Sequence, residues 1–555
     1  MKDKLFNKKD IINNYNKFDY KKNIQLDKLC NKNFEKILNE LYPILNKIHK
    51  INWGKRSWRV LIGPWLHRYI CIITNRYFIL KKIKKNNNSF FNKLILRNST
   101  IPLSKNLNHF TDLSMQDNYN YKLLSLLSKK IKNKKIDIKI EDKLKSKNKI
   151  CEIRNKIFGF LLKILNILLC GKKNIFLYKT YFGHFKVILH LILKLKQFPI
   201  LYPSFLEKGF SNEKISMEKR NKLKNLKSKN EIEKILNELI YIFIPKFYLE
   251  DFNNNLLSAK KIYPNKANVV LTAVGIWKDT LFKIWLSEKL NNKTKLICRQ
   301  HGGNYGQNEL IFEEKHEIKV SDYFFSWGWV NKNKKVLPCF GIIEPKLRKF
   351  EKKFKKILLV TQTPHKFLYF DNGTMDNYKS KNYINFLDVF FEKIQHKIKN
   401  KIYLRFKNLN SNSPKKEIDV HFKNLLTKKY KNLHISNIKN FYQDIENTKL
   451  VIFTYNGTAF LNSLKTNVPS IILFNKNYIY LKKSSKKIYF EMKKNHIFFD
   501  DPIRASNFIN QNLNNIDEWW ESKKVRNTIS NYLDLYNKKY NGLNDNFFYY
   551  LKKII

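Results

Sequence analysis

Residues 267–303 decide the fold of this chain, and they read ANVVLTAVGIWKDTLFKIWLSEKLNNKTKLICRQHGG. The run from Ala267 to Gly275 is apolar and rich in valine, as expected of a buried strand. The segment DTLFKIWLSEKL has the spacing of a helix, and KLICR resumes the strand pattern before a pair of glycines. Strand, helix and strand in this order predict a βαβ unit with two parallel strands.

The same alternation precedes this unit and begins again after it. NIFLY (174–178) is a short strand pattern followed by the helical VILHLILKLK, and SDYFFSWGW adds a further strand. From Lys355 the chain reads strand KKILLV, helix NYINFLDVFFEKIQHKI, strand KIYLRFKN, strand LVIFTYNGT, helix AFLNSLKTN and strand PSIILFN. A second series of this kind predicts a second doubly wound α/β domain.

We therefore predict the α/β class with two Rossmann-like, doubly wound domains, a helical N-terminal extension and C-terminal helices. The expected parts are a mainly helical region 1–150, a first Rossmann-like acceptor-side domain 151–348, a second Rossmann-like nucleotide-donor domain 349–535 and a tail 536–555. A chain of 555 residues is long enough for several such cores.

Two apolar segments raise the question of a membrane span. Val60 to Leu80 carries His67, Arg68 and Arg76 in its middle, and Ile157 to Cys170 is shorter than the roughly 20 residues that a span needs. We expect buried or interfacial helices there, with Gly63 and Pro64 breaking the first of them. The N-terminus has no apolar core, so no signal peptide or transmembrane anchor is predicted, and a cytoplasmic location is expected.

The charge balance bears on partners. The 108 Lys and Arg residues exceed the 45 Asp and Glu residues by +63. The excess is mostly lysine, accompanies much Asn, Ile, Phe and Tyr, and forms no basic stripe, which favours a codon-level bias over a nucleic-acid site. An anionic membrane surface, approached peripherally from the inner face, stays open as a partner. The six cysteines are scattered, so neither a disulfide framework nor a metal site is expected.

The loop after KLICR is the first candidate site. His301 stands at a strand end, where a histidine of near-neutral pKa can act as a general base for an acceptor hydroxyl. Gly302 and Gly303 let a ligand approach the backbone, and Gln300 and Tyr305 complete the expected acceptor side. The alternative is a turn whose histidine only caps the strand.

The turn between LVIFTY and AFLNSLKTN is the second candidate. Thr454, Asn456, Gly457 and Thr458 place small and hydroxyl residues at a helix N-terminus, where free N–H groups favour a phosphate or sugar. An ordinary helix cap is the alternative.

Arg405, with Lys407, at the end of KIYLRFKN is the third candidate, because a guanidinium there could hold a diphosphate through two hydrogen bonds. A solvated surface cation is the alternative. Thr361, Thr363 and His365, after the first strand of the second series, are weaker candidates for the donor site. Arg56 and Arg59 lie in an aromatic-rich stretch and are candidates for the cleft. No P-loop, dinucleotide fingerprint, zinc-protease motif or nucleophile elbow occurs in the sequence.

Several stretches together resemble a family of bacterial transferases found among lipopolysaccharide and surface-carbohydrate genes. They are WRVLIGPWL with the following NRY, QHGGNYG, SDYFFSWG and NHIFFDDP with DEWW, spread over residues 50–535. The second half is also similar to the donor domain of GT-B glycosyltransferases. The family's acidic residue after the donor turn is replaced here by Asn462. The QHG element is similar to the His-Gly loop of teichoic-acid-type polyol-phosphate transferases, which implies a base role for His301.

The resulting hypothesis is a glycosyltransferase that uses a nucleotide-sugar and a glycan or lipid-linked acceptor of a surface polysaccharide or lipopolysaccharide. We expect direct displacement with neither metal nor cofactor. A polyol-phosphate (CDP-glycerol-type) transferase and a non-catalytic scaffold of polysaccharide assembly are the alternatives. Nucleic-acid binding ranks third, because no recognition motif accompanies the charge.

Overall fold

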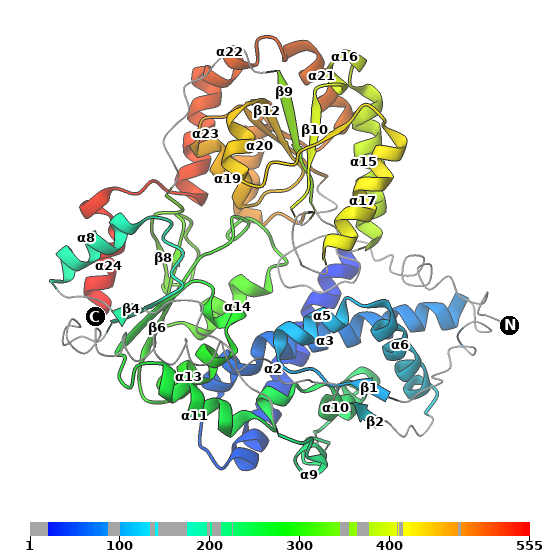
Figure 1. The fold of residues 1–555 in the computed structure, drawn as a ribbon, viewed down its shortest axis with the longest axis vertical. Coiled ribbons are helices and arrows are strands. Elements are labelled where there is room, and N and C mark those ends of the chain that lie inside the picture. The colour runs from blue at the N-terminus through cyan, green and yellow to red at the C-terminus, as the bar shows by residue number, and fades with distance from the viewer. Residues whose placement is uncertain are drawn as a thin grey trace.

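The computed structural model describes residues 20–86, 91, 100–133, 139–141, 175–196, 200–201, 213–224, 226–343, 355–362, 377–407, 409, 415–475 and 479–555. These residues form two large parallel sheets, each flanked by helices, and a helical region beside the first sheet (Figure 1). The predicted α/β class with parallel sheets is therefore confirmed, while the division into domains at the bounds given above stays a prediction.

The first sheet holds six strands within the described residues, in the order β4-β3-β5-β6-β7-β8. The strands are β3 (Ile175–Tyr178), β4 (Ile200–Leu201), β5 (Val269–Thr272), β6 (Lys295–Arg299), β7 (Tyr323–Ser326) and β8 (Val336–Pro338). Neighbouring strands all pair in parallel. The predicted βαβ unit is present as β5, α13 and β6, and the switch in strand order falls between β3 and β5.

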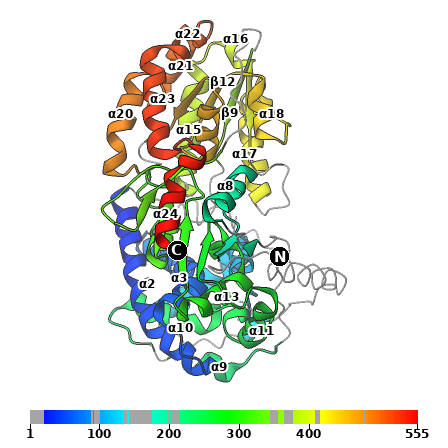
Figure 2. The same cartoon turned by 90° about the vertical axis from the view of Figure 1, so that its left-hand side faces the viewer.

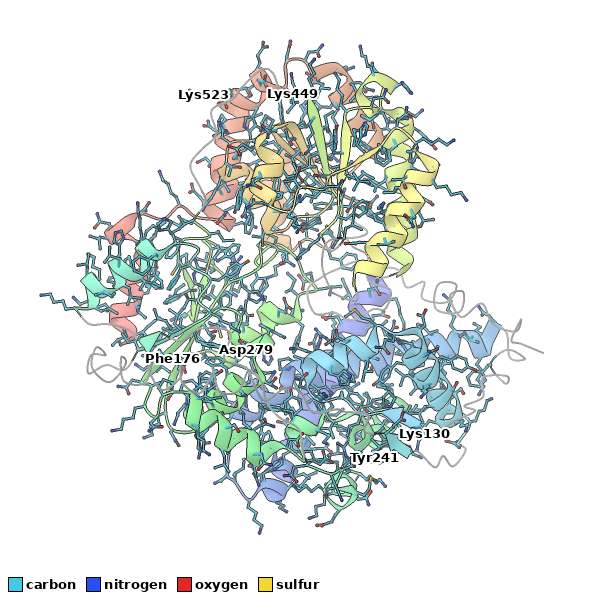
Figure 3. The ribbon with its side chains drawn as sticks, viewed as in Figure 1. Lys130, Phe176, Tyr241, Asp279, Lys449 and Lys523 are labelled. Atoms are coloured by element: carbon cyan, nitrogen blue, oxygen red, sulfur yellow. The ribbon has the colours of Figure 1, made fainter. Side chains whose placement is uncertain are left out.

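Helices connect and cover these strands. They are α8 (Phe185–Leu195), α9 (Met217–Asn221), α10 (Glu231–Phe243), η1 (Lys246–Tyr248), α11 (Phe252–Ile262), α12 (Gly275–Lys278), α13 (Thr280–Asn291) and α14 (Phe312–Val320). Phe176 of β3 is fully buried, and Asp279, the N-cap residue of α13, accepts a hydrogen bond of 3.0 Å from the Tyr178 hydroxyl of the same strand; Figure 3 labels Phe176 and Asp279.

The second sheet has the strand order β11-β10-β9-β12-β13-β14 over the residues described, again wholly parallel. Its strands are β9 (Lys356–Val360), β10 (Ile402–Arg405), β11 (His434–Ile435), β12 (Thr448–Phe453), β13 (Ser470–Leu473) and β14 (Phe498–Phe499). Numbered along the chain, this is the order 3-2-1-4-5-6 of dinucleotide-binding sheets, with the switch between β9 and β12. Loops at the carboxyl ends of these two strands are the place where such sheets bind ligands.

The helices of this second part are α15 (Asn377–Lys393), α16 (His396–Lys399), α17 (Lys415–Lys429), α18 (Phe441–Glu446), α19 (Thr458–Lys465), η2 (Lys483–Ser485), α20 (Lys486–Lys494), α21 (Pro502–Asn512), α22 (Ile516–Glu521) and α23 (Lys523–Tyr536). Figure 3 places Lys449 and Lys523 at the far end of this part, away from the first sheet.

The N-terminal region contains α2 (Tyr20–His49), α3 (Lys55–Asn86), α5 (Leu107–Ser114) and α6 (Asp117–Ile131), with a short parallel pair β1 (Thr100–Pro102) and β2 (Lys139–Glu141). The sequence predicted a break at Gly63 and Pro64, but α3 continues through both. The helix is buried along most of its length against α2 and α13, and this packing supports it where Pro64 cannot donate a hydrogen bond. Gly63 has no room for a side chain, because a Cβ there would lie 2.7 Å from the His316 ring.

No helix in the described ranges is long and apolar enough to cross a bilayer. The expected buried position of the Val60–Leu80 segment is confirmed. The second apolar segment, Ile157 to Cys170, lies outside the described residues.

After α23 the chain returns to the first sheet. The Lys538 N–H donates to the Trp327 carbonyl at 2.9 Å, and the Lys538 carbonyl accepts from the Gly341 N–H at 2.8 Å. The final elements, η3 (Gly542–Asn544) and α24 (Asn546–Ile554), then pack beside α8 and β8 (Figure 2). The C-terminal segment thus ties the two sheets together.

Candidate functional site

His301 lies two residues beyond the end of β6, with 16% of its side chain exposed. Its Nδ1 is 3.3 Å from the Glu317 Oε1, and its Nε2 is 3.9 Å from the Glu313 Oε2. Both carboxylates belong to α14, which packs against β6 and β7. A negative charge on either side chain would stabilise a proton taken up by His301.

Glu317 is fully buried and is itself held by two donors. The indole N–H of Trp277 and the hydroxyl of Tyr305, at 3.1 Å, both donate to its Oε1. Burial raises the pKa of the Glu317 carboxyl well above its usual range, although the hydrogen bond from Trp277 opposes the shift. Its Oε2 has no hydrogen-bond partner among the described residues. Burial also raises the pKa of Tyr305, so this phenol keeps its proton and acts as a donor.

The two glycines after His301 bring this loop against the second sheet. The Gly303 N–H donates to the Thr458 Oγ1 at 3.0 Å, and Thr458 is the first residue of α19. A Cβ on Gly303 would lie 2.6 Å from the Thr458 nitrogen and 2.7 Å from the Gly457 carbonyl carbon. Only a residue without a side chain fits between the loop and this helix. The two candidate loops of the sequence therefore touch.

Asparagine and glutamine side chains extend this contact. The Asn308 and Asn456 amides exchange two hydrogen bonds, at 3.1 and 2.7 Å, and both residues are buried. The Gln307 Oε1 accepts from the Tyr489 and Tyr532 hydroxyls, each at 2.7 Å. Buried polar groups of this kind fix one geometry when all partners are present.

Gln300 shapes the His301 loop from within. Its Oε1 accepts from the Trp327 N–H at 2.9 Å and from the Trp329 indole at 2.7 Å, and its Nε2 donates to the Gly302 carbonyl at 2.8 Å. The side chain is completely buried. These hydrogen bonds hold the loop in place, and the predicted contact of Gln300 with an acceptor stays a prediction.

At the switch point of the second sheet, hydroxyl groups hold the strand ends together. The Thr454 Oγ1 donates to the Val360 carbonyl at 3.1 Å and lies 2.6 Å from the Tyr383 hydroxyl. The same oxygen accepts from the Gln362 N–H at 3.1 Å, and the Thr361 hydroxyl donates to the Arg405 carbonyl at 3.0 Å. Of the residues that the sequence singled out, Thr361 and Thr454 thus lie at this switch point, and their hydroxyls are bonded within the protein.

Comparison with known proteins identifies a family. A family model described as LIC12162 family transferase matches residues 5–547. The chain belongs to this family. The expectation of a transferase is thereby confirmed, because the match covers nearly the whole chain.

This LIC12162 family transferase was also compared with curated proteins and with solved structures. No curated protein matches it significantly. It is similar to a solved structure of the wall teichoic acid polymerase TagF soaked with CDPG, at 10% identity and a TM-score of 0.28, over 74% of this chain and 97% of that one.

The guanidinium of Arg405 in this transferase is bonded to other groups of the protein. It forms an ion pair with Asp444 and donates to the Ile438 carbonyl at 2.6 Å and the Lys439 carbonyl at 3.0 Å. These bonds fix the loop before α18. Lys407 is exposed, and its predicted phosphate contact stays a prediction. Thr363 and His365 lie outside the described residues.

The two N-terminal arginines are also paired within the protein. Arg56 donates to the Asp322 carboxylate at 2.6 Å and to the Val320 carbonyl at 2.7 Å, which joins α3 to the start of β7. Arg59 is buried and donates to the Glu35 carboxylate of α2. These bonds join α3 to the first sheet and to α2, and the predicted place of both arginines in a cleft stays a prediction.

Sequence reasoning missed the carboxylate partner of His301 and the residues that lock the loops. Glu317 and Glu313 stand in FEEKHE, directly after the glycine loop, and this acidic cluster in a lysine-rich chain was the available signal. Asn308 gave no such signal, because its partner Asn456 is far away in the sequence.

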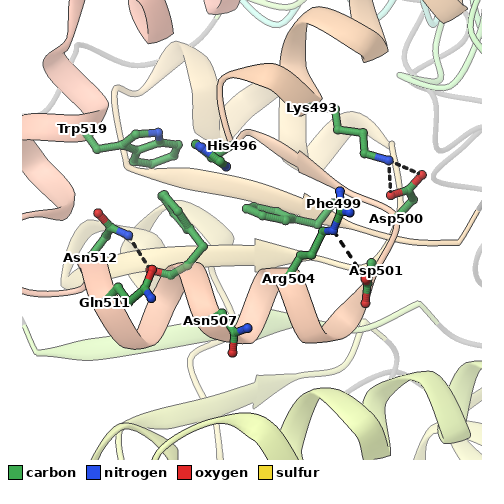
Figure 4. A pocket seen from close by; sticks show the side chains of 11 residues that line it. Lys493, His496, Phe499, Asp500, Asp501, Arg504, Asn507, Gln511, Asn512 and Trp519 are labelled. Carbon is green, nitrogen blue, oxygen red and sulfur yellow. Dashed lines mark hydrogen bonds and ion pairs between the residues drawn. The ribbon is translucent and has the colours of Figure 1, made fainter.

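A separate cavity of about 390 Å³ lies at the β14 edge of the second sheet (Figure 4). Its charges are paired with each other: Lys493 with Asp500 at 2.7 Å, and Arg504 with Asp501 at 3.8 Å. Within the described residues there is also no group of three or more His, Cys, Asp or Glu side chains suited to a metal ion. The His301 loop therefore remains the best candidate site.

Proposed function

We propose that this transferase moves a sugar from a nucleotide-sugar to a hydroxyl of a surface polysaccharide or lipopolysaccharide acceptor, with His301 as general base. The observation that supports this most is the hydrogen bond from Gly303 to Thr458. It brings the histidine loop to the amino end of α19, which follows β12 at the switch point of the second sheet.

The amino end of α19 suits a phosphate. Its N-cap, Gly457, supplies no side-chain hydrogen bond to the first turn. Backbone N–H groups and the positive end of the helix dipole favour an anion at such a position. Because Gly303 already lies against the Thr458 nitrogen, a donor diphosphate would bind beside this contact, where Gly457, Thr458 and Ala459 are partly exposed. The bond that breaks would then lie near His301.

The reaction proceeds as follows in this proposal. The His301 Nε2 takes the proton of the acceptor hydroxyl while that oxygen forms a bond to the anomeric carbon. The bond from the anomeric carbon to the diphosphate oxygen breaks, and the nucleoside diphosphate leaves with the electron pair. Glu313 stabilises the imidazolium, the buried carboxyl of Glu317 orients the His301 ring from its Nδ1 side, and the helix N-terminus stabilises the leaving diphosphate. The scheme requires neither a metal nor a cofactor.

The same groups would serve a polyol-phosphate donor, in which the hydroxyl attacks phosphorus instead. The two reactions differ in the nucleotide that the protein recognises. We would measure thermal stabilisation of the full chain by CMP, CDP, UDP and GDP and by their sugar and polyol conjugates. Selective stabilisation by a UDP-sugar or GDP-sugar series supports the proposal, and stabilisation confined to a CDP-polyol supports polyol-phosphate transfer.

Two variants make this screen decisive. His301→Gln should keep the nucleotide-dependent shift and lose turnover by about 10²–10⁴-fold, since only the base is removed. Arg405→Ala is unsuitable as a binding probe, because it breaks the ion pair with buried Asp444 and changes stability by itself. If no nucleotide stabilises the wild-type chain selectively, the donor site is wrong and a scaffold role is the better account.

A further inference from the structure

Helix α8 leaves an apolar stripe uncovered on the surface of the first sheet's helical layer. Phe185, Leu189 and Leu193 are 68%, 45% and 57% exposed, and their spacing of four residues puts them on one face of the helix. The opposite face is anchored, since Val187 and Leu191 are fully buried in the cluster that also contains residues of α24. Surface leucines and phenylalanines standing singly are normal, but three in register form a patch.

The surroundings of the stripe are basic. Lys186, Lys194 and Lys196 are all exposed, and no Asp or Glu occurs between Lys179 and Lys196. The adjoining helix α24 adds exposed Tyr549, Lys552 and Lys553 without an acidic residue of its own (Figures 1 and 2). An apolar stripe flanked by exposed lysines is complementary to an anionic lipid surface, which offers both acyl chains and negative headgroups. A soluble protein partner would not require both features together.

We propose that α8 is the site at which this protein docks on an anionic lipid surface, with its apolar stripe inserted at the headgroup level and its lysines on lipid phosphates. The helix has 11 residues, which is far too short to span a bilayer and fits a helix lying in the interface.

The position of α8 links this surface to the candidate site. The loop that begins α8 is tied to β6, because the Arg299 Nη1 donates to the Tyr181 carbonyl at 2.9 Å. Arg299 is the last residue of β6, two positions before His301. Docking at α8 therefore brings the site to the membrane surface, where a lipid-linked acceptor would be found. That last consequence rests on the proposed function, but the docking itself does not.

The test is flotation of the full-length chain with vesicles of phosphatidylcholine alone or mixed with phosphatidylglycerol. We expect binding to the mixed vesicles that weakens as salt rises. The variant Phe185→Ser with Leu189→Ser and Leu193→Ser should partition at least about tenfold more weakly. A matched control, Leu257→Ser with Val330→Ser, removes apolar residues that are 58% and 66% exposed elsewhere and should bind as the wild type does.

A charge variant tests the same surface without touching the stripe. Changing Lys186, Lys194 and Lys196 to Gln should reduce binding to anionic vesicles and flatten its salt dependence. Changing the exposed Lys332, Lys334 and Lys523 to Gln removes the same charge elsewhere and should have little effect. This pair decides the question even if the stripe variant folds poorly.

Three outcomes would overturn the proposal. The first is that the wild type does not bind the anionic vesicles. The second is that the stripe variant binds them to the same extent as the wild type. The stripe variant could instead change the solution mass while leaving vesicle binding intact, which would assign the stripe to a contact between two copies. None of these readouts depends on turnover, so failure of the docking surface and failure of the proposed reaction are distinguishable.

Discussion

The backbone amide of Gly303 donates a hydrogen bond of 3.0 Å to the hydroxyl of Thr458, although one residue follows a strand of the first sheet and the other begins a helix of the second. This bond joins the only candidate general base of the sequence analysis, His301, to the predicted donor turn. A hydrogen bond between neutral groups contributes modestly, but a buried N–H left without an acceptor costs about 1–3 kcal/mol.

Removing the acceptor should loosen the junction. Thr458→Val keeps the shape of the side chain and leaves the buried Gly303 N–H unpaired, so we expect a loss of about 1–2 kcal/mol in the free energy of unfolding and a lower turnover. Thr458→Ser retains the hydroxyl and serves as the control. Urea unfolding of both variants checks this, and equal stability of the two would contradict the assigned bond.

Adding a methyl group should separate the two loops. In Gly303→Ala the new Cβ meets backbone atoms of Gly457 and Thr458 at 2.6–2.8 Å, and backbone cannot move aside as a side chain can. We expect a destabilisation of roughly 1–3 kcal/mol and a larger loss of transferase activity. Gly302→Ala meets only side-chain atoms of Asn304 and Tyr305, the nearest at 2.9 Å. Its effect on stability should be the smaller of the two, and the reverse order would refute the argument.

The amide pair between the sheets should behave as one unit. Asn308→Ala removes both bonds to the Asn456 amide, which keeps its bond to the Tyr489 hydroxyl, and Asn456→Ala removes both bonds to the Asn308 amide. Each variant should cost about 1–3 kcal/mol. The double variant should cost clearly less than the sum, with a coupling of about 1 kcal/mol or more. A double-mutant cycle on chemical unfolding measures this. Strict additivity would mean that the two residues act independently.

The buried carboxyl of Glu317 should make stability depend on pH. Because burial raises its pKa in the folded state, the folded chain holds a proton that the unfolded chain loses above about pH 4.5. The stabilising contribution is therefore present at low pH and is lost as pH rises from 4.5 through the raised pKa. In Glu317→Gln this slope disappears. Urea unfolding of both chains over that pH range provides the measurement, and parallel profiles would show that Glu317 does not titrate there.

The ion pair of Arg405 should prove structural. Asp444 is completely buried, and loss of the guanidinium leaves it with Lys356 and the Ser436 hydroxyl. Arg405→Ala should therefore lower the free energy of unfolding by about 2–3 kcal/mol. Lys407→Ala, at an exposed position of the same strand end, should change it by less than about 0.5 kcal/mol. The measurement is thermal and urea unfolding of both variants without any nucleotide. If Arg405→Ala is then as stable as the wild type and only nucleotide binding is weakened, Arg405 is a phosphate contact after all.

Much of the fold could be predicted from the sequence, because strands and helices leave local patterns. The units around β5, α13 and β6, and around β9, β12 and α19, lie where their hydrophobic periods predict them. The break predicted at Pro64 was wrong. The missing N–H of a proline can be read from the sequence, but the packing of α3 against α2 and α13, which holds the helix together there, cannot.

Sequence patterns were enough to predict the α/β class with parallel sheets, the loops that carry His301 and Thr458, and the membership of this chain among transferases. The packed structure was needed to show that these loops touch, that Glu317 and Glu313 lie next to His301, and that Arg405 forms an ion pair with Asp444. The reason is physical. Hydrophobic periodicity follows from neighbours along one element, whereas hydrogen bonds, ion pairs and burial depend on which distant segments the packed core brings together.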